Sequence, residues 1–346
     1  MIVRPHSAKT RASVSVVIPC YNYGRYLPAA VASALEQPGV VVDVTIVDDA
    51  STDGSQAVAL ELAAADRRVR AVIHETNMGH VATYNDGLGR AEATYVVLLS
   101  ADDLLAPGSL QRSTALMEAR PDVGLVYGYA PDFADAPPPH RDEVRNWSVW
   151  SGQAWLRRIC RRGTNIIVNP EAMLRTSVLT ELGGYDAALP HSADMDLWMR
   201  AARLADVGRV NGPYQAYYRV HGGNMHMTDY AGLLTDMKER LRTFDQFFTN
   251  ADDKLRNSDR MLASARRAIA YEAVRVARMT GGDPVGAAAL AHFAIECYPR
   301  ITSTALWIAY RSSGHGPLRD ARRAAAAFEY DLRWRYRWRR TRRFGT

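Results

Sequence analysis

Two pairs of adjacent carboxylates each follow an apolar run of the sequence. Asp48 and Asp49 end the run VVVDVTIVDD, and Asp102 and Asp103 end the run YVVLLSADD. Neighbouring carboxylates in a cleft repel each other unless a cation lies between them and a bound anion. Mg²⁺ and similar hard ions use one or two carboxylates and take their other ligands from phosphate oxygens and water. The second pair therefore predicts a Mg²⁺ or Mn²⁺ site beside a phosphate-bearing ligand.

The first pair predicts contact with a nucleoside instead. A carboxylate at a strand end can accept a hydrogen bond from a pyrimidine N–H or a ribose hydroxyl, and Tyr21 follows the run SVSVVIP, where its ring can stack on a flat base. The alternative interpretation is a helix cap and turn over residues 48–54, which Ser51 and Asp53 would suit. That alternative leaves two consecutive acids at a buried strand end unexplained.

Two motifs further along the chain carry the remaining reactive groups. Asp194 and Asp196 lie in ADMDLWMR, where acids at the start of a helix are also favoured by the helix macrodipole. His221 leaves the run YYRV and enters a glycine turn. A lone histidine is more often a packed or surface residue than a metal ligand, so its position adds little by itself.

The elements that would position these groups alternate along the first part of the chain. Strands that are apolar on both faces and alternate with helices indicate a mostly parallel sheet covered on both sides. Ligands of such sheets bind beyond the carboxyl ends of the strands, where the polar clusters fall. The predicted strands are SVSVVIP, VVVDVTIVDD, RVRAVIH, ATYVVLLS and VGLVYGY, and the predicted helices include residues 25–36 and 55–65.

The sequence changes character after this region. Residues 137–139 are prolines and predict a loop, residues 151–220 resume mixed structure, and the chain beyond Thr228 predicts helices almost without strands, with a break at Gly281-Gly282-Asp283-Pro284. We therefore expect a flexible N-terminal tail at residues 1–12, an α/β domain at 13–225, a helical region at 226–330 and an Arg/Trp-rich tail at 331–346.

Composition excludes several classes of protein. The 346 residues are 47% hydrophobic and 23% charged, and no apolar run approaches the roughly eighteen residues that a membrane span needs. The opening MIVRPHSAKTRAS lacks the apolar region of a secretory signal. Cys20, Cys160 and Cys297 are scattered, which predicts neither a disulfide framework nor a metal site and indicates a reducing, cytoplasmic compartment.

The net charge of +6 is concentrated at the end of the sequence, where LRWRYRWRRTRRFGT contains seven arginines and no acid. A whole-protein affinity for nucleic acid is therefore not expected. In an extended conformation the apolar residues of this tail would share one face and the arginines the other. We expect either an edge strand or solvated end that wraps the helical region, or peripheral attachment to the inner face of the cell membrane, with aromatic rings at the headgroup level.

Taken in this order, the motifs resemble those of the family 2 glycosyltransferases with the GT-A fold. The resemblance covers about Ser13 to Asn224 and not the helical region after it. It implies a Rossmann-like, mostly parallel sheet, with residues 13–130 as the nucleotide-sugar half and 131–225 as the acceptor half. It rests on VSVVIPCYN, VTIVDDASTDGS, NMG, Asn85-Asp86-Gly87-Leu88, YVVLLSADD, LGGYDAALPHSADMDLWMR and YYRVHGGN.

The resemblance also implies roles for individual residues. Asp194 would be the base that takes a proton from the acceptor hydroxyl, in a single displacement that inverts the anomeric carbon. Asp103 and His221 would hold Mn²⁺ or Mg²⁺, which would neutralise charge on the departing nucleoside diphosphate. The donor would contact Pro19, Tyr21, Asp48, Asp49, Asn77, Asn85, Ser100 and Asp102, and the acceptor side would include Gly184, Tyr185, His191 and Asp196.

The substrates follow from the resemblance only in outline. A UDP-sugar is the usual donor of the family, and the acceptor would be a glycan, a lipid-linked molecule or a small molecule. Two residues depart from the family pattern: Ala193 stands where an acid often precedes the base, and Tyr84 stands where an arginine often precedes Asn85.

These departures leave a second interpretation open, in which the protein binds sugar nucleotides as a catalytically silent scaffold. A nucleotidyltransferase is disfavoured, because it would need a glycine-rich, basic loop after the first strand, where this chain has PCYNYGRYL. The dinucleotide-binding and P-loop glycine motifs are absent from the same place.

Overall fold

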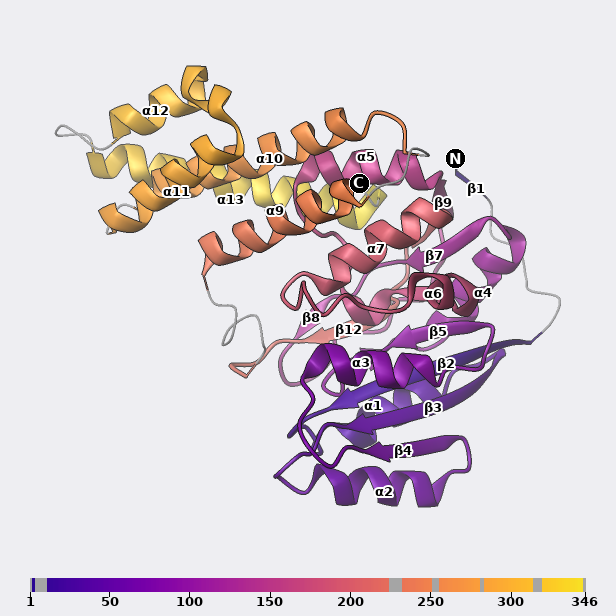
Figure 1. Cartoon of the computed structure of the whole chain (residues 1–346). Helices are drawn as coiled ribbons and strands as arrows, with labels where there is room; N and C mark the ends of the chain where they lie inside the picture. Colours follow the sequence, from indigo (N-terminus) through magenta and orange to yellow (C-terminus); the bar gives the residue numbers. More distant parts are fainter. Residues whose placement is uncertain are drawn as a thin grey trace. The chain divides into compact units, whose positions relative to one another are not determined.

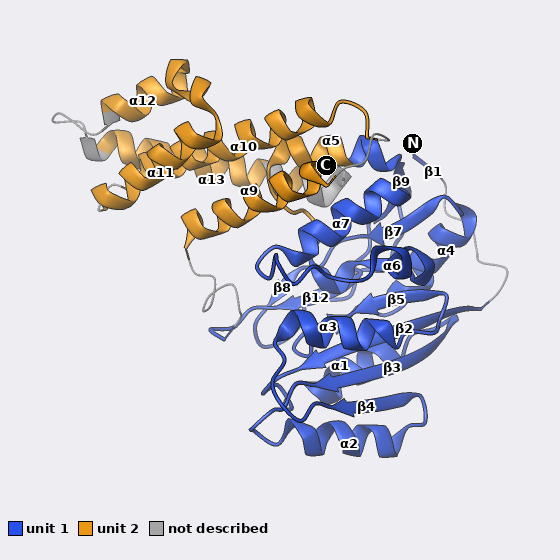
Figure 2. Cartoon of the chain, viewed as in Figure 1, with its two compact units in different colours: residues 1–155, 167–224, 345 blue, residues 156–166, 225–344, 346 orange. Residues whose placement is uncertain are grey.

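The computed structural model describes residues 2–3, 11–223, 232–250, 255–280, 283–313 and 319–344. The chain divides into two compact units, residues 1–155 with 167–224 and residues 156–166 with 225–344 (Figure 2). The expected domain boundary at residue 225, and Asn224 at the end of the last motif, lie outside the described residues.

Four parallel strands form one half of the main sheet, in the order β5-β2-β3-β4. Their residues are largely β-branched and buried, as expected for strands covered on both faces. The pairing of β2 with β3 is long, from Ala12 opposite Val40 to Cys20 opposite Asp48. The predicted parallel strands are confirmed as β2 (Ala12–Cys20), β3 (Val40–Asp48), β4 (Val69–Ile73) and β5 (Tyr95–Leu98).

Helices cover both faces of these strands (Figure 1). Side chains alternate between the two faces along a strand. Val14 and Val16 share a core cluster with residues of α1 (Leu27–Leu35), α2 (Ser55–Ala65) and α4 (Ser109–Ala119). Val17 lies on the other face, where Gly87 of α3 (His80–Gly89) packs against it. The two-sided α/β architecture predicted from the sequence is therefore confirmed.

The other half of the sheet contains antiparallel strands that the sequence pattern does not predict. β10 (Met173–Arg175) lies antiparallel between β5 and β7 (Val123–Tyr127), the fifth predicted strand. β11 (Asp206–Asn211) is parallel to β7, and β9 (Asn146–Trp150) is antiparallel to β11. The helices of this part are α5 (Gly152–Arg162), α6 (Thr176–Leu182) and α7 (Ala193–Leu204), with a 3₁₀ turn at Asn169–Glu171.

The first residues correct the expectation of a flexible tail over residues 1–12. Ile2 pairs with Ser148 and Val3 with Trp147, so that β1 (Ile2–Val3) covers the edge of β9. An open sheet edge presents unpaired backbone groups, and even a short apolar segment can pair with them. Met1 and residues 4–10 lie outside the described part of the chain.

A small second sheet brings distant segments together. β12 (Ala216–Arg219) lies between β6 (Leu104–Leu105), to which it is antiparallel, and β8 (Asp132–Phe133), to which it is parallel. β6 directly follows the acidic pair at residues 102–103. The end of β12, with the YYRVHGG motif, is thereby held beside those acids.

The second unit is helical, as predicted for the chain after residue 228. Its described helices are α9 (Leu233–Thr249), α10 (Ser258–Met279), α11 (Pro284–Cys297), α12 (Ala305–Ser313) and α13 (Arg319–Phe344), with a 3₁₀ helix at Pro299–Ser303. The break predicted at residues 281–284 separates α10 from α11, although residues 281–282 are not described. None of the described helices is long and apolar enough to span a membrane.

The extended conformation expected for the basic tail is wrong. α13 is one helix of 26 residues that passes through the expected boundary at residue 330 without interruption. Its first part is alanine-rich, and arginine and leucine are also good helix formers, so a helix that begins at residue 319 propagates through the tail. The aromatic residues and arginines are consequently spread around the helix and do not segregate to two faces.

The three cysteines are free and buried. Burial raises the pKa of the Cys20 thiol to about 11 and that of Cys160 to about 12, so neither is a reactive thiolate at neutral pH. The expectation that the chain has no disulfide framework agrees with this finding.

Because α3 packs closely on the sheet, alanine substitutions of its two glycines are expected to change the stability of the protein in opposite directions. A Cβ at Gly87 would overlap the side chains of Val17 and Val47, whereas a Cβ at Gly89 on the same helix would meet nothing within 4 Å. Gly87→Ala should lower the free energy of unfolding by about 1–3 kcal/mol through overpacking. Gly89→Ala should raise it by about 0.5–1 kcal/mol through helix propensity. Urea denaturation of both variants checks this; equal effects of the two changes would contradict the packing argument.

Candidate active site

The candidate site lies where the strand order reverses. From β2 the chain adds β3 and β4 on one side, and it returns through α3 to place β5 on the other side of β2. Such a switch point leaves a crevice at the carboxyl ends of the two central strands. Residues 20–22 follow β2 and residues 100–103 follow β5, so the polar clusters predicted from the sequence come together here.

The loops after β2 and β3 are joined by their own side chains. The backbone N–H of Asn22 donates to Oγ of Ser51 (2.8 Å), and that of Thr52 donates to Oδ1 of Asn22 (2.8 Å). Tyr21 precedes this junction and its side chain is 45% exposed, which leaves the ring available to a ligand. Pro19 lies in β2 itself, opposite Val47.

The two acids at the end of β3 are buried and engaged with the chain. Oδ1 of Asp48 accepts a hydrogen bond from the backbone of Ser51 (2.9 Å), and its Oδ2 has no partner among the described residues. Asp49 accepts from the backbone N–H groups of Met78 (2.8 Å) and Gly79 (2.9 Å). Asn77 also accepts from Gly79 (3.1 Å), so Asp49 and Asn77 together hold the turn that precedes α3.

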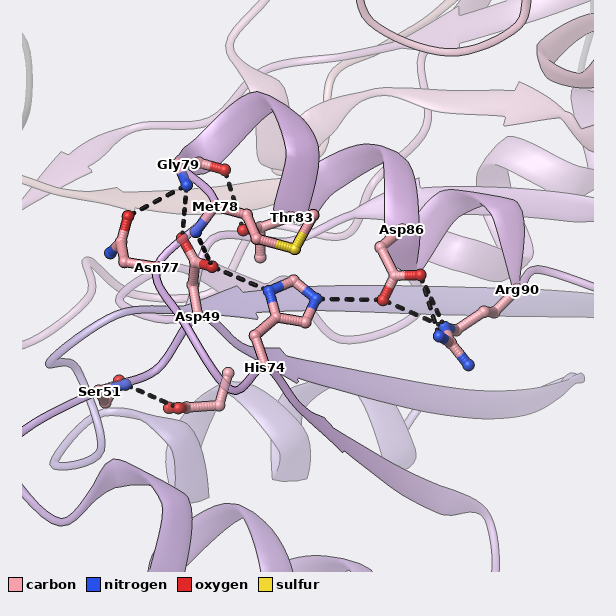
Figure 3. A network of polar contacts seen from close by, with 10 residues as sticks. Asp49, Ser51, His74, Asn77, Met78, Gly79, Thr83, Asp86 and Arg90 are labelled. Carbon is pink, nitrogen blue, oxygen red and sulfur yellow. Dashed lines mark hydrogen bonds and ion pairs between the residues drawn. The ribbon is translucent and has the colours of Figure 1, made fainter.

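His74 connects Asp49 to a second carboxylate (Figure 3). Its Nδ1 lies 2.8 Å from Asp49 and its Nε2 lies 3.2 Å from Asp86, which also pairs with Arg90 on the same helix (3.0 Å). Burial alone would lower the pKa of His74, but the two carboxylates outweigh burial and the pKa is raised. Burial would raise the pKa of Asp49, yet His74 and the backbone donors lower it. The imidazolium form is thus favoured between two carboxylates.

The acids after β5 face the end of β12. Asp103 is buried, its Oδ1 accepts a hydrogen bond from the backbone N–H of Arg219 (2.8 Å), and the side chain of Ser100 also bonds to it. Arg219 donates through Nε to the backbone carbonyl of Asp102 (2.8 Å). Nε2 of His221 lies 3.0 Å from Oδ2 of Asp102. The structure therefore places His221 against Asp102, and Asp103 against the Arg219 backbone.

Tyrosines of the first loop fix the position of His221. The ring of Tyr26 stacks on His221 with centroids 5.7 Å apart, and the ring of Tyr23 lies 5.5 Å away. The hydroxyl of Tyr23 donates to the carbonyl of Gly223 (3.0 Å), whose N–H donates to Nδ1 of His221 (3.1 Å). Because Nδ1 accepts this hydrogen bond, Nε2 is the nitrogen that faces Asp102.

The Asp102–His221 pair fits two neighbouring ligands of a divalent ion. In the structure the two side chains are joined by a hydrogen bond between Nε2 and Oδ2 (3.0 Å), and a bound ion would take the place of that hydrogen bond. Oδ2 of Asp103 is buried without a partner in the described chain. Among the described residues, no group of three or more histidine, cysteine or acidic side chains could hold a metal by itself. An ion here would need phosphate oxygens and water as its other ligands.

Asp194 lies in the first turn of α7 and is half-buried. Burial raises the pKa of Asp194 to about 6, and a hydrogen bond with Tyr185 opposes this shift. The preceding residue is an alanine, so no acid stands directly before Asp194. Ala193 is buried. His191 lies just before the helix and is half-buried. A carboxylate with this pKa is ionised at neutral pH and is still basic enough to accept a proton.

The same three carboxylates affect the pKa values of two tyrosines, Tyr84 and Tyr218. Burial raises the pKa of Tyr84, and the negative charges of Asp194, Asp102 and Asp103 raise it further. The same three acids, together with Asp132, raise the pKa of Tyr218, again after burial. The structure thus brings the predicted base near the acidic pair of β5.

The turn at residues 182–185 is clamped from two helices. Asn85 of α3 accepts a hydrogen bond from the backbone N–H of Tyr185 (2.7 Å) and donates to its carbonyl (2.9 Å). Arg200 of α7 donates to the carbonyls of Leu182 (3.0 Å) and Gly184 (2.7 Å). Gly184 has a φ of +88° and leaves no room for a Cβ, which would overlap Oδ1 of Asn85.

Asp196 supports this clamp. It is buried, and its Oδ2 lies 2.6 Å from Nε of Arg200. The ring of Tyr84 packs edge-on against Tyr185 at 5.5 Å, and His80 packs against Tyr84 at the same distance. The aromatic row and the clamp together fix the ring of Tyr185, whose hydroxyl donates to Oδ1 of Asn169 (3.2 Å) and lowers the pKa of Asp194.

Sequence reasoning missed His74, Arg219 and Tyr218. His74 could have been found, because it directly follows β4 and the carboxyl ends of parallel strands share one edge. Arg219 and Tyr218 carry no such signal, because their place depends on the pairing of β12 with β6 and β8.

Comparison with known proteins identifies the family. The profile described as Glycosyl transferase family 2 matches residues 15–183. An uncharacterized glycosyltransferase of Nostoc sp. (strain PCC 7120) is 28% identical over 222 residues, which cover 62% of this chain and 67% of that protein. About a third of the relative's own length thus lies outside the match.

Two solved structures share the fold at 18% sequence identity. S. aureus TarS in complex with UDP-GlcNAc superimposes with a TM-score of 0.60, over 88% of this chain and 93% of that one. Mannosyltransferase PcManGT from Pyrobaculum calidifontis, in complex with GDP-Man and Mn²⁺, gives 0.55 over 94% and 89%. At this identity the likeness concerns the fold, and it agrees with the α/β domain and helical region predicted from the sequence. The chain is therefore a glycosyltransferase with the GT-A fold, and its residues 15–183 form a family 2 domain.

Proposed function

We propose that the protein transfers a sugar from a nucleoside-diphosphate sugar to an acceptor hydroxyl, with inversion at the anomeric carbon and Asp194 as the base. One observation carries this proposal: the charges of Asp194, Asp102 and Asp103 act on the same two phenols, those of Tyr84 and Tyr218. A base and a pair of phosphate-side acids within one region are what a single displacement needs.

The chemical step balances with the residues present. Asp194 accepts the proton of the acceptor hydroxyl as that oxygen forms a bond to the anomeric carbon. The bond from that carbon to the phosphate oxygen breaks, and its electron pair leaves with the nucleoside diphosphate. Tyr185 orients Asp194 through a hydrogen bond, and the clamp of Asn85 and Arg200 holds Tyr185. We assign Asn85 and Asp196, both expected to touch substrates, to this supporting role.

A divalent ion, Mn²⁺ or Mg²⁺, fits the pair of Asp102 and His221 and would neutralise charge on the leaving diphosphate. This assignment modifies the expectation from the resemblance, in which Asp103 and His221 were the ligands. It is supported by the direct contact between the side chains of Asp102 and His221, whereas Asp103 contacts the backbone of Arg219. Asp103 holds the Arg219 backbone, and burial together with the charge of Asp102 raises its pKa.

The donor is proposed to be a UDP-sugar, whose base stacks on the exposed ring of Tyr21. TarS was solved with UDP-GlcNAc and PcManGT with GDP-Man, so relatives of this fold accommodate either base. Asp48 and Asp49 are buried, and both are engaged by backbone N–H groups. We therefore propose that they shape the nucleoside pocket by fixing the surrounding loops.

The acceptor is proposed to be a glycan, a lipid-linked molecule or a small molecule. A lipid-linked acceptor would require contact with a membrane surface.

The metal assignment predicts different behaviour of two neighbouring acids. Asp102→Asn should remove the increase in UDP affinity caused by Mn²⁺, because it removes a ligand charge next to His221. Asp103→Asn keeps the acceptor for the Arg219 N–H and should retain most of that increase. Calorimetric titration of UDP with and without Mn²⁺ measures both. If Asp103→Asn loses the effect and Asp102→Asn keeps it, Asp103 is the ligand.

The assignment of the base predicts a split between binding and turnover. Asp194→Asn should leave donor affinity within a few-fold and lower turnover by about 10²–10⁴-fold, the usual contribution of a positioned base. Tyr185→Phe removes a hydrogen bond that lowers the pKa of Asp194, so the acidic limb of its pH–rate profile should move above about pH 6. If Asp194→Asn kept turnover within about tenfold of the unaltered protein, His191 or Asp196 would be the next candidate.

The His74 network predicts a pH-dependent stability. The pKa of His74 is raised in the folded state, so its contribution is complete below the unfolded value of about 6.5 and is lost as the pH rises through the folded value. His74→Asn should therefore destabilise the protein by about 2 kcal/mol at pH 6 and by less at pH 9. Thermal unfolding across this range measures the difference. The surface variant His292→Asn is the control, and a His74→Asn deficit that grew with pH would refute the argument.

A further inference from the structure

Helix α13 carries a row of large apolar side chains on its surface. Phe328, Leu332 and Tyr336 are spaced four residues apart, which aligns them along one side of a helix. Their side chains are 70%, 57% and 65% exposed. Ala321 and Ala325 are also exposed and extend the row toward the start of the helix. A contiguous exposed apolar row of this kind marks an interaction surface more often than a single exposed residue does.

The row is not the side by which α13 is attached to its own unit. Among the residues of α13 whose burial is described, Ala326 is the buried one, and Glu329 lies 3.6 Å from Arg278 of α10. Figure 1 shows α13, in yellow, running beside α10. Beyond Tyr330, every side chain of α13 that the structure describes is exposed, at residues 331–336 and 339–340. The second part of the helix therefore offers its apolar residues to a partner outside this unit.

Positive charge accompanies the apolar row. After Asp331 the sequence contains seven arginines and no acid. Arg333 pairs with Glu329 (3.0 Å) and Arg335 with Asp331 (2.7 Å), which neutralises two of the seven. On a helix, Arg335 and Arg339 fall on the same side as Leu332 and Tyr336, because they are three residues apart from them. We call the side formed by Phe328, Leu332, Arg335, Tyr336 and Arg339 the α13 face.

We propose that the α13 face binds an anionic membrane surface, with the helix lying in the plane of the headgroups. Its apolar side chains would enter the boundary of the acyl chains, and its arginines would contact anionic lipid headgroups. Nucleic acid would engage the arginines but would leave the side chains of Phe328 and Leu332 exposed. A neutral protein surface would cover the apolar row and leave the excess arginines unpaired. An anionic lipid surface covers the apolar side chains and also pairs with the arginines. At about 1.5 Å per residue, the 26 residues of α13 offer about 39 Å of contact length.

This inference goes further than the proposed function in naming the surface and its residues. Its biological purpose rests on that function, since a membrane-bound enzyme would be placed to use a lipid-linked acceptor. Membrane binding itself is measured without donor, acceptor or turnover, so failure of the one proposal is distinguishable from failure of the other.

Co-sedimentation with vesicles tests the proposal on the full chain. The unaltered protein should bind vesicles that contain phosphatidylglycerol and should not bind vesicles of phosphatidylcholine alone. Phe328→Ser with Leu332→Ser should weaken binding at least tenfold, and Arg335→Glu with Arg339→Glu should weaken it about thirtyfold or more at low salt. Matched controls are Ile308→Ser and the pair Arg260→Glu with Arg311→Glu, which change exposed residues of other helices in the same unit and should bind like the unaltered protein.

Circular dichroism and thermal unfolding establish that each variant is folded before its binding is compared. Loss of binding in the face variants, with binding kept by the controls, supports the proposal. Absence of binding by the unaltered protein, equal binding to neutral vesicles, or equal weakening by the control variants would overturn it. If Phe328→Ser with Leu332→Ser instead converts a dimer to a monomer in light scattering and vesicle binding is absent, the α13 face is a contact between copies of this chain.

Discussion

Repulsion between the adjacent carboxylates of Asp102 and Asp103 is the constraint around which the site of the first unit is arranged. Asp102 and Asp103 at the end of β5 and Asp194 at the start of α7 act on common tyrosines. Two unit charges 4 Å apart at an effective dielectric constant of 20 interact with about 4 kcal/mol, so such a grouping persists only with compensation. The backbone N–H of Arg219 binds the carboxylate of Asp103, its guanidinium binds the backbone carbonyl of Asp102, and His221 contacts the carboxylate of Asp102. The diphosphate of the proposed donor would add negative charge to this region, so the proposed ion and the donor would be expected to bind together.

Around this centre, polar side chains hold backbone turns. Asp49 fixes the turn before α3, Asn85 binds both backbone groups of Tyr185, and the Asp196–Arg200 pair holds the carbonyls of the preceding turn. Apart from the Asp196–Arg200 pair, which lies within α7, each of these bonds joins different segments of the chain. Catalysis by positioning requires reacting groups to be fixed closely, and a base held by a clamped tyrosine meets that requirement.

The parallel strands, their helices and the meeting of the polar clusters could be predicted from the sequence, because strand alternation and the switch-point rule depend on local pattern. The antiparallel strands β10 and β1 could not, since they have only three and two residues, too few to show a period. The sequence indicates which polar side chains gather at the site more reliably than it indicates their roles. The carboxylate of Asp49 and the amide of Asn85 can bind either a ligand or the backbone of a turn. Only the fold decides between these two roles. The tail was misread because alternation of arginine with aromatic residues resembles a strand, whereas helix propagation from an alanine-rich start overrides it.

The pairing of Arg219 with Asp103 has a consequence for the order in which the protein assembles. The two residues are 116 positions apart. At ordinary synthesis rates of 5–20 residues per second, β5 leaves the ribosome roughly 6–23 s before β12 can close over it. The strand order β5-β2-β3-β4 can form during that interval, but the acids after β5 stay hydrated and mutually repelled until β12 arrives. A nascent chain would thus complete the parallel part of its sheet before the acids after β5 acquire their partner in β12.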